Sequence, residues 1–250
     1  MSIDWKLLSF RKERRAVAGI LSGGQVYELA LVIADAAGLS TTNVLEDWPS
    51  WSDRITRVVA EGLPASGVPL GEVELLAPLL YPGTVYIAGL NYHDHITEMA
   101  ERRRSLGEDA GVDALERPWH VIKGSRACVV GTEANVRIPA GAERLDWEAE
   151  LAVIIGREGR SIPIEAAMDF VAGYAVANDL SARDLSRRSD VRPESTFRID
   201  WLRHKSFDGA CPLGPWITPA ASGAVAPRCT VQARASLGPT VKKVISPSRR

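Results

Sequence analysis

Two glutamates separated by one residue are the first side chains whose spacing could do chemistry. Glu148 and Glu150 precede the apolar run 151–155. Alternate residues of a strand share a face, so both carboxylates are expected to point the same way. Adjacent carboxylates that enter a core repel each other and resist burial unless a cation lies between them. The alternative is a solvent-facing strand edge with two ordinary glutamates.

A third carboxylate ends a second short apolar strand. The run 174–177 leads into Asp179, and Arg183 follows at a turn or helix start. Asp179 could be a helix N-cap, which is a common use of aspartate. It could instead be a third oxygen ligand beside the two glutamates. A ligand set made only of carboxylates suits Mg²⁺, Mn²⁺ or Ca²⁺ rather than zinc.

A histidine and a glutamate form a candidate general base. A strand reaches Gly89, and a helix is expected to start near Asn91. On that helix His95 and Glu98, three residues apart, are neighbours. A carboxylate beside an imidazole orients it and raises its basicity, as a water-activating base requires. The alternative is an ordinary surface ion pair. His93 has no comparable partner and is taken as structural.

Lys205 is the last residue singled out for chemistry, in a segment rich in glycine and proline. Its ammonium group could bind a substrate carboxylate. An isolated lysine in a loop would by itself indicate nothing.

The elements that position these residues begin with a hairpin. Apolar runs at 16–21 and 26–31 flank the turn signal at 22–25, which predicts two antiparallel strands. Apolar residues at helical spacing predict an amphipathic helix over 51–61, which Gly62 ends. A small N-terminal domain is therefore expected over residues 1–80.

The rest of the chain alternates short strands with turns and few helices. One clear helix is predicted at 165–171. This order of elements indicates an α+β fold with a large mixed sheet. The predicted strands are 129–130, 136–138, 150–155 and 174–177. The charged insert 100–117 is expected to form a mobile helix or lid.

Four segments resemble, in the same order, motifs of the fumarylacetoacetate hydrolase family. The resemblance covers about residues 83–217, and four motifs in order are far more specific than one. The motifs are Gly-x-Asn-Tyr-x-x-His-x-x-Glu at 89–98, Glu-x-Glu at 148–150, Asn-Asp-x-Ser-Ala-Arg-Asp at 178–184 and Lys-Ser-Phe-Asp-Gly-x-x-Pro-x-Gly-Pro at 205–215.

The resemblance implies a mixed β-roll fold and a homodimer. It implies a divalent metal, Mg²⁺ or else Mn²⁺ or Ca²⁺, and a His–Glu pair on a short helix that orders over the substrate. The metal ligands would be Glu148, Glu150 and Asp179. The catalytic pair would be His95 and Glu98, and the substrate-binding residues would be Arg183, Lys205 and Lys123.

The implied activity is hydrolysis of a carbon–carbon bond in small 2,4-dioxo acids, of the acylpyruvate or fumarylpyruvate type, through a metal-bound enolate. The same chemistry serves a 2-oxo-dicarboxylate decarboxylase or isomerase of the family. A role in the catabolism of aromatic compounds is expected with either activity.

The end of the chain departs from the family pattern. Residues 219–250 contain no Asp or Glu and six basic residues, and they lack the family's closing glycine-rich loop. The catalytic domain is therefore expected over 81–218, C-terminally incomplete, and followed by a solvated basic tail rather than a nucleic-acid-binding segment. A non-catalytic, truncated remnant of the family is the second hypothesis.

Composition limits the remaining function classes. The chain has 250 residues, 46% of them apolar, and a formal net charge of −1, so nothing global favours a nucleic-acid or membrane partner. Three scattered cysteines form no disulfide framework and no zinc motif. With no signal-peptide pattern at the start and no apolar run long enough to span a bilayer, a cytoplasmic protein is expected.

Overall fold

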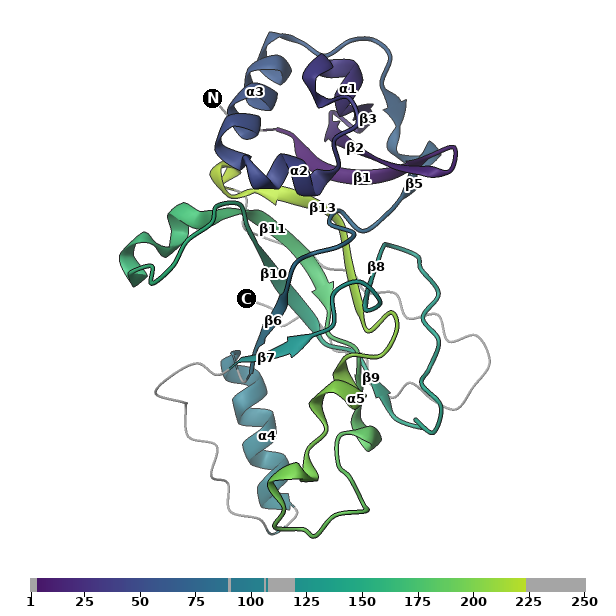
Figure 1. The fold of residues 1–250 in the computed structure, drawn as a ribbon, viewed down its shortest axis with the longest axis vertical. Helices are drawn as coiled ribbons and strands as arrows, with labels where there is room; N and C mark the ends of the chain where they lie inside the picture. The colour runs from purple at the N-terminus through teal and green to yellow at the C-terminus, as the bar shows by residue number, and fades with distance from the viewer. Residues whose placement is uncertain (1–3, 90, 106, 108–119, 224–250) are drawn as a thin grey trace.

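A large, mostly antiparallel sheet forms the centre of the computed structural model, which describes residues 4–223 apart from 90, 106 and 108–119. The order of strands is β10-β11-β13-β1-β2-β3-β4, with β5 beside β1 and β8 beside β13 (Figure 1). All pairs are antiparallel except β13 with β8. The predicted α+β fold with a large mixed sheet is therefore confirmed.

The large sheet has nine strands, and two short pairs, β6 with β7 and β9 with β12, lie apart from it. The strands are β1 (Lys6–Lys12), β2 (Arg15–Ser22), β3 (Gln25–Glu28), β4 (Val68–Pro69), β5 (Glu74–Leu75), β6 (Val85–Ala88), β7 (His120–Lys123), β8 (Val129–Val130), β9 (Leu145–Asp146), β10 (Ala149–Ile155), β11 (Val171–Asn178), β12 (Ser181–Ala182) and β13 (Cys211–Pro219).

Most helices of the described residues are short, and α3 and α4 are the longest. The α-helices are α1 (Leu29–Val32), α2 (Thr41–Glu46), α3 (Trp48–Glu61), α4 (His93–Ser105) and α5 (Trp201–Lys205). The 3₁₀ helices are η1 (Ala34–Ala36), η2 (Leu70–Glu72), η3 (Ile164–Phe170), η4 (Arg183–Leu185), η5 (Thr196–Arg198) and η6 (Ala220–Ser222). No helix of the described ranges combines the length and apolarity needed to cross a bilayer.

The predicted hairpin is present, although its second strand is shorter than expected. Gly23 and Gly24 supply the two positive φ angles, 56° and 78°, of a two-residue turn between β2 and β3. The chain then leaves the sheet after Glu28, and α1 takes the place of the strand predicted to residue 31. Leucine and alanine favour helices, and Leu29, the first residue of α1, is fully buried in the core.

The helix predicted over 51–61 is α3, which begins three residues earlier. Pro49 lies in its first turn, a position where the missing N–H costs nothing, and Trp48 is buried against the sheet. Gly62, at a φ of 112°, ends it as predicted. The helix expected near Asn91 is α4, which begins at His93.

Two predicted elements differ in the structure. The helix predicted at 165–171 is the 3₁₀ helix η3, which spans Ile164–Phe170, and Val171 already opens β11. The strand predicted at 136–138 is wrong, because these residues pair with no other strand of the described chain. The side chain of Val136 instead packs under Gly209, so its apolar character serves a loop contact.

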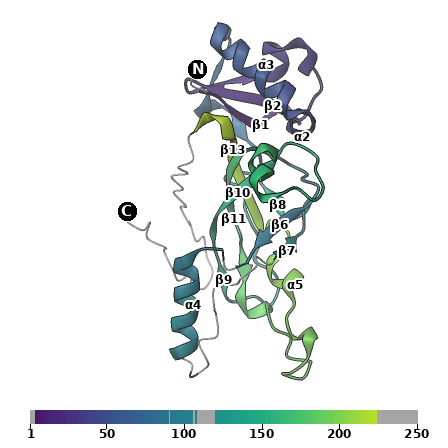
Figure 2. The ribbon, with the colours of Figure 1, turned by 90° about the vertical axis from the view of Figure 1, so that its left-hand side faces the viewer.

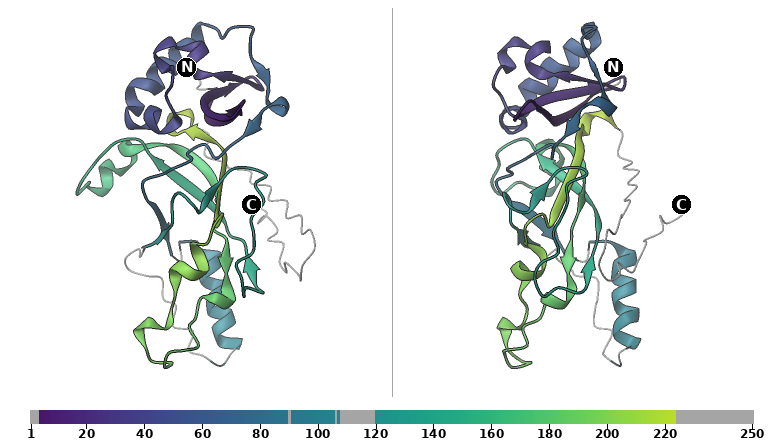
Figure 3. Two further views of the ribbon diagram at one scale, coloured as in Figure 1. Left: turned by 45° about the vertical axis from the view of Figure 1, so that its right-hand side comes forward. Right: turned by 90° about the vertical axis from the view of Figure 1, so that its right-hand side faces the viewer.

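The first 80 residues and the central strands share one sheet and one core. Leu7 of β1 pairs with Ile217 of β13, so the sheet continues from one part into the other. The buried cluster around Trp5 and Trp48 also includes Ile154 and Ala172 of the central strands. Figures 2 and 3 show α1–α3 at one end of an elongated molecule, and α4 and α5 at the other.

Four expectations fall outside what the structure describes or tests. Most of the insert after Ser105 and the tail after residue 223 lie outside the described residues, so the lid and the basic tail stay predictions. The domain limits and the homodimer also stay predictions.

Gly156 lies where Trp48 of α3 and Ala172 of β11 pack closely, which leads to a prediction. A Cβ at this position would lie 2.7 Å from Cβ of Ala172 and 2.8 Å from Cβ of Trp48. We expect Gly156→Ala to lower the free energy of unfolding by ~1–3 kcal/mol in urea, because neither neighbour has room to move. Gly71→Ala is the control, since nothing lies within 4 Å of its Cβ position. Equal stability of both variants would contradict this packing.

Candidate active site

A buried aspartate between two lysines lies at the centre of the site. Asp179 follows β11, Lys123 ends β7 and Lys205 ends α5. Oδ1 of Asp179 is 2.8 Å from Nζ of Lys123, and Nζ of Lys205 contacts its Oδ2. Lys205 also donates to Oε2 of Glu148 at 2.7 Å. The four side chains therefore form one charged cluster, in which Lys123 and Asp179 are 1% and 4% exposed.

Strand register brings Glu148 to this cluster. Ala149 pairs with Asn178 where β10 and β11 meet. Beyond this pair the amide of Glu148 donates to Oδ1 of Asn178 at 3.1 Å, and the amide of Asp179 donates to the carbonyl of Glu148 at 2.8 Å. Two predicted ligands, Glu148 and Asp179, are thus held side by side by main-chain bonds.

Lys123 is bound by protein oxygens on all sides. Besides Asp179, its ammonium group donates to the carbonyl of Leu180 at 3.3 Å and to the carbonyl of Lys205. The ammonium group therefore makes two hydrogen bonds to main-chain carbonyls and one salt bridge to Asp179. Its predicted contact with substrate stays a prediction, and in this structure Lys123 positions Asp179.

Arg183 binds two carboxylates of the segment before β10. Its Nε lies 2.9 Å from Oδ2 of Asp146, and its Nη2 contacts Oε1 of Glu148. Asp146 was not singled out by the sequence, although it continues the alternation of Glu148 and Glu150 and could have been found from it. The predicted role of Arg183 in substrate binding is untested.

The pKa values of Glu148 and Glu150 are shifted in opposite directions. Burial opposes the ionisation of Glu148, but Lys205 and Arg183 outweigh it and hold its pKa below the ordinary value. Burial raises the pKa of Glu150 to about 7; a hydrogen bond from Tyr92 opposes this rise. Repulsion from the other carboxylates adds to the rise. Glu150 therefore lacks the cation that Glu148 has.

Tyr92 joins the segment before α4 to the strand that carries Glu150. Its hydroxyl oxygen accepts the amide of Leu151 at 3.3 Å and its hydrogen is shared with Glu150. Tyr92 was not singled out by the sequence, although it lies inside one of the four motifs.

The chemistry of the carboxylates fits a hard divalent cation, whereas their present arrangement is one of salt bridges. The pKa of Glu150 is raised, so a nearby positive charge such as a divalent cation would stabilise its ionised form. In the described residues, however, no three His, Cys, Asp or Glu side chains surround a common point as metal ligands do. Lys205 contacts both Glu148 and Asp179, so a cation would compete with its ammonium group for the same oxygens.

A cavity of about 660 Å³ opens beside Glu150, Asp179 and Lys123. Apolar residues make up most of the rest of its described lining, with Asn91 and Tyr92 near the start of α4. The apolar lining residues include Leu79, Val85, Ile87, Val129, Ala152, Ile154, Ala177 and Leu213. Neither Arg183 nor Lys205 is among the lining residues.

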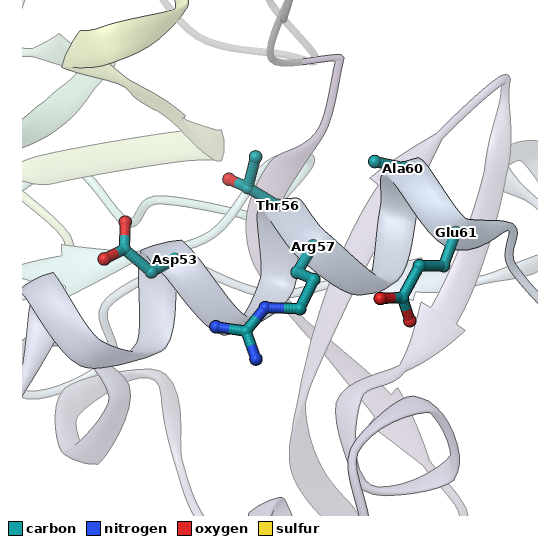
Figure 4. Close-up of a pocket in the computed structure, with 5 residues that line it drawn as sticks. All are labelled: Asp53, Thr56, Arg57, Ala60 and Glu61. Carbon is teal, nitrogen blue, oxygen red and sulfur yellow. The ribbon is translucent and has the colours of Figure 1, made fainter.

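A second hollow, of about 470 Å³, differs in kind (Figure 4). Its lining residues are Asp53, Thr56, Arg57, Ala60 and Glu61, all on α3. Figure 4 shows these five side chains on one helix. This surface offers no convergent chemistry.

The predicted His95–Glu98 pair lies on α4, whose first residue directly follows Tyr92. Glu98 is exposed, and the side chain of His95 lies outside the described part of the structure. Their pairing stays a prediction.

His204 is a buried residue that sequence reasoning missed. It is 3% exposed, and neither ring nitrogen has a hydrogen-bond partner in the described structure. Burial, together with Lys205 and Arg183, lowers its pKa to about 4, so the ring is neutral beside these cations. Its position before Lys205 gave no signal of this environment.

The buried Lys123–Asp179 pair should dominate the stability of this region. We expect Lys123→Met to cost ~3–5 kcal/mol of unfolding free energy, because part of the charge of Asp179 loses its partner in the interior. Lys12→Met is the matched control, since Lys12 pairs with Glu28 at an exposed position where solvent weakens the pair, and it should change stability far less. Urea unfolding measures both, and equal costs would contradict the buried pairing.

The raised pKa of Glu150 makes stability of the cation-free protein depend on pH. Its folded-state pKa of about 7 exceeds the ordinary 4.5, so the stabilising contribution of its proton is complete below pH 4.5. This contribution is lost as the pH rises through about 7. In EDTA, Glu150→Gln should therefore gain stability relative to the parent on going from about pH 5 to about pH 8.

The exposed Glu158 provides the control for this measurement. Glu158→Gln should follow the parent at every pH. Addition of Mg²⁺ or Mn²⁺ should reduce the pH dependence of the parent, because a bound cation replaces the proton. Identical pH profiles for Glu150→Gln and the parent would show that this carboxyl is not the group responsible.

Solved structures of known proteins share this fold. The chain is similar to the fumarylacetoacetate hydrolase from psychrophilic Exiguobacterium antarcticum, with a TM-score of 0.61, 28% identity and coverage of 89% of this chain and 69% of that one. It is also similar to maleylpyruvate hydrolase from Sphingobium sp. SYK-6, solved with manganese(II) and pyruvate, with a TM-score of 0.59, 25% identity and coverage of 86% and 67%.

Curated relatives are similar over part of their length. The human mitochondrial oxaloacetate tautomerase FAHD2B is 36% identical over 175 residues, which cover 70% of this chain and 49% of that protein. The mitochondrial oxaloacetate tautomerase fahd2 of Xenopus laevis is 37% identical over 143 residues, which cover 57% and 39%. The chain thus spans about half or less of the length of these two relatives.

A family model described as the fumarylacetoacetate (FAA) hydrolase C-terminal domain matches residues 84–243. The match runs past residue 217, where the resemblance read from the motifs ends. Because this match covers well over half of the sequence, and the fold agrees with it, the chain belongs to the fumarylacetoacetate hydrolase family.

Proposed function

We propose that this protein is a divalent-metal-dependent hydrolase that cleaves a carbon–carbon bond in small 2,4-dioxo acids of the acylpyruvate type. The observation that carries the proposal is the cavity, with Glu150 and Asp179 at one end and mainly apolar side chains over the rest of its described lining. A 2,4-dioxo acid also has one polar and one apolar end. Its oxo-acid end binds hard cations, and its acyl end is a carbon chain.

The carboxylate cluster would hold the cation. Glu148, Glu150 and Asp179 are its ligands in this proposal, and the cation would polarise the carbonyl oxygens of the substrate when bound. Lys123 forms a salt bridge with Asp179, and Arg183 forms one with Glu148. The positions of the ligands are therefore fixed by neighbours that need not touch the substrate.

Water activation falls to His95, with Glu98 as its orienting carboxylate. Support comes from α4, since the helix begins directly after Tyr92 at the cavity. The imidazole takes a proton from water, and the hydroxyl oxygen adds to the carbonyl carbon C4 of the substrate. The C3–C4 bond then breaks with its electrons passing to C3. A proton returned to C3 completes pyruvate, and the acyl group leaves as a carboxylic acid.

An oxaloacetate tautomerase is the second candidate. The observation in its favour is the name of the human and Xenopus relatives, which are 36% and 37% identical over the matched residues. Tautomerisation moves one proton between carbon and oxygen and needs no water. Decarboxylation or isomerisation of a 2-oxo dicarboxylate would use the same end of the cavity.

The test measures each reaction on the purified chain with Mg²⁺ or Mn²⁺. We expect acylpyruvates to lose their enol absorbance and to release one pyruvate per molecule, with activity abolished by EDTA. His95→Ala should lower kcat by ~10²–10⁴-fold, the usual contribution of a positioned base. Calorimetry should show its divalent-cation affinity unchanged, because His95 is not a proposed ligand.

His93→Ala is the matched control, since His93 is an exposed histidine on the same helix. It should leave kcat and cation affinity as they are. Turnover of oxaloacetate alone would favour the tautomerase, and turnover of no substrate would favour a non-catalytic relative of the family.

A further inference from the structure

The buried ammonium group at the polar end of the cavity is already paired, so it is not free to bind a second carboxylate. Lys123 is the one buried basic residue of the described lining, and its ammonium group is already paired with Asp179 and donates to the carbonyls of Leu180 and Lys205. The other basic lining residue, His120, is exposed at the start of β7. Glu150 and Asp179 repel an anion rather than bind it.

The wall away from that end is part of the protein's apolar core. Val129 and Leu213 belong to a buried cluster, and Val85 and Ala152 pack against it while facing the cavity. Ile87, two residues along β6 from Val85, extends the same wall. Carbon chains gain from contact with such a surface, whereas a carboxylate that leaves water beside these five side chains meets no hydrogen-bond donor on any of them.

We propose that the site selects 2,4-dioxo acids whose acyl chain is uncharged and aliphatic, and discriminates against chains that end in a second carboxylate. This inference rests on the proposed hydrolase function and narrows its substrate class. The apolar wall is responsible for the preference for uncharged acyl chains, and Ile87 is one of the specificity-determining residues of this wall.

An isosteric pair of substrates tests the inference. 4-Methylpentanoylpyruvate and succinylpyruvate differ only in the end of the acyl chain, where two methyl groups replace two carboxylate oxygens. We expect kcat/KM to favour the aliphatic substrate by at least ~10-fold, since unpaired polar groups weigh heavily in discrimination. In the unaltered protein, kcat/KM should also rise from acetylpyruvate to butanoylpyruvate.

A positive charge introduced into the apolar wall should change the preference between the two substrates. Ile87→Lys should narrow or reverse the preference, because a lysine at this half-buried position offers succinylpyruvate a cation. Ile164→Lys is the control, since Ile164 is 91% exposed, lies outside the cavity lining and adds the same charge elsewhere. It should keep both the activity and the preference.

The outcomes separate the two proposals. Equal or better cleavage of succinylpyruvate by the unaltered protein would overturn the selection and leave the hydrolase function standing. A preference unaltered in a folded Ile87→Lys variant would overturn the role of Ile87. Cleavage of neither acylpyruvate would overturn the hydrolase function itself.

Discussion

The burial of Asp179 is the constraint on which the site depends. A carboxylate removed from water is costly unless cations and donors surround it, so Lys123 and Lys205 have to arrive from β7 and α5. Both lysines are buried as well, and Lys123 in turn needs the carbonyls of Leu180 and Lys205. Each member therefore requires the others, and three segments far apart in sequence are fixed at one point.

The room beside this cluster follows from strand register. Glu150 pairs with Ala177, and Ala152 pairs with Ala175, so small side chains lie opposite one another where β10 and β11 run together. Ala152 and Ala177 both line the cavity. Larger residues at these positions would fill the space next to the carboxylates. The same two strands thus supply the carboxylates and the space beside them.

Local sequence patterns predicted the turns, helix ends and strands whose structure depends on neighbouring residues in the sequence. The turn at 22–25, the end of α3 at Gly62 and the strand after Glu148 follow from turn chemistry, a helix stop signal and alternation. The partners of Lys123 and Arg183 did not follow, because salt bridges over long separations leave no mark on neighbouring residues. The strand at 136–138 was wrongly predicted for a related reason. Val136 is apolar because it contacts Gly209, which is distant in the sequence, and not because it lies in a strand.

The pairing of β1 with β13 has a consequence for how the chain folds during synthesis. Leu7 meets Ile217, so the part of β1 around Leu7, which β5 does not cover, receives its second neighbour only after more than 200 further residues have been added. At ~5–20 residues per second, this edge of β1 waits for ~10–40 s on the ribosome. Pairing over such a separation also slows folding, because loop closure precedes any gain from contact. The first 80 residues are therefore the part of the nascent chain that most needs protection from association through an open strand edge.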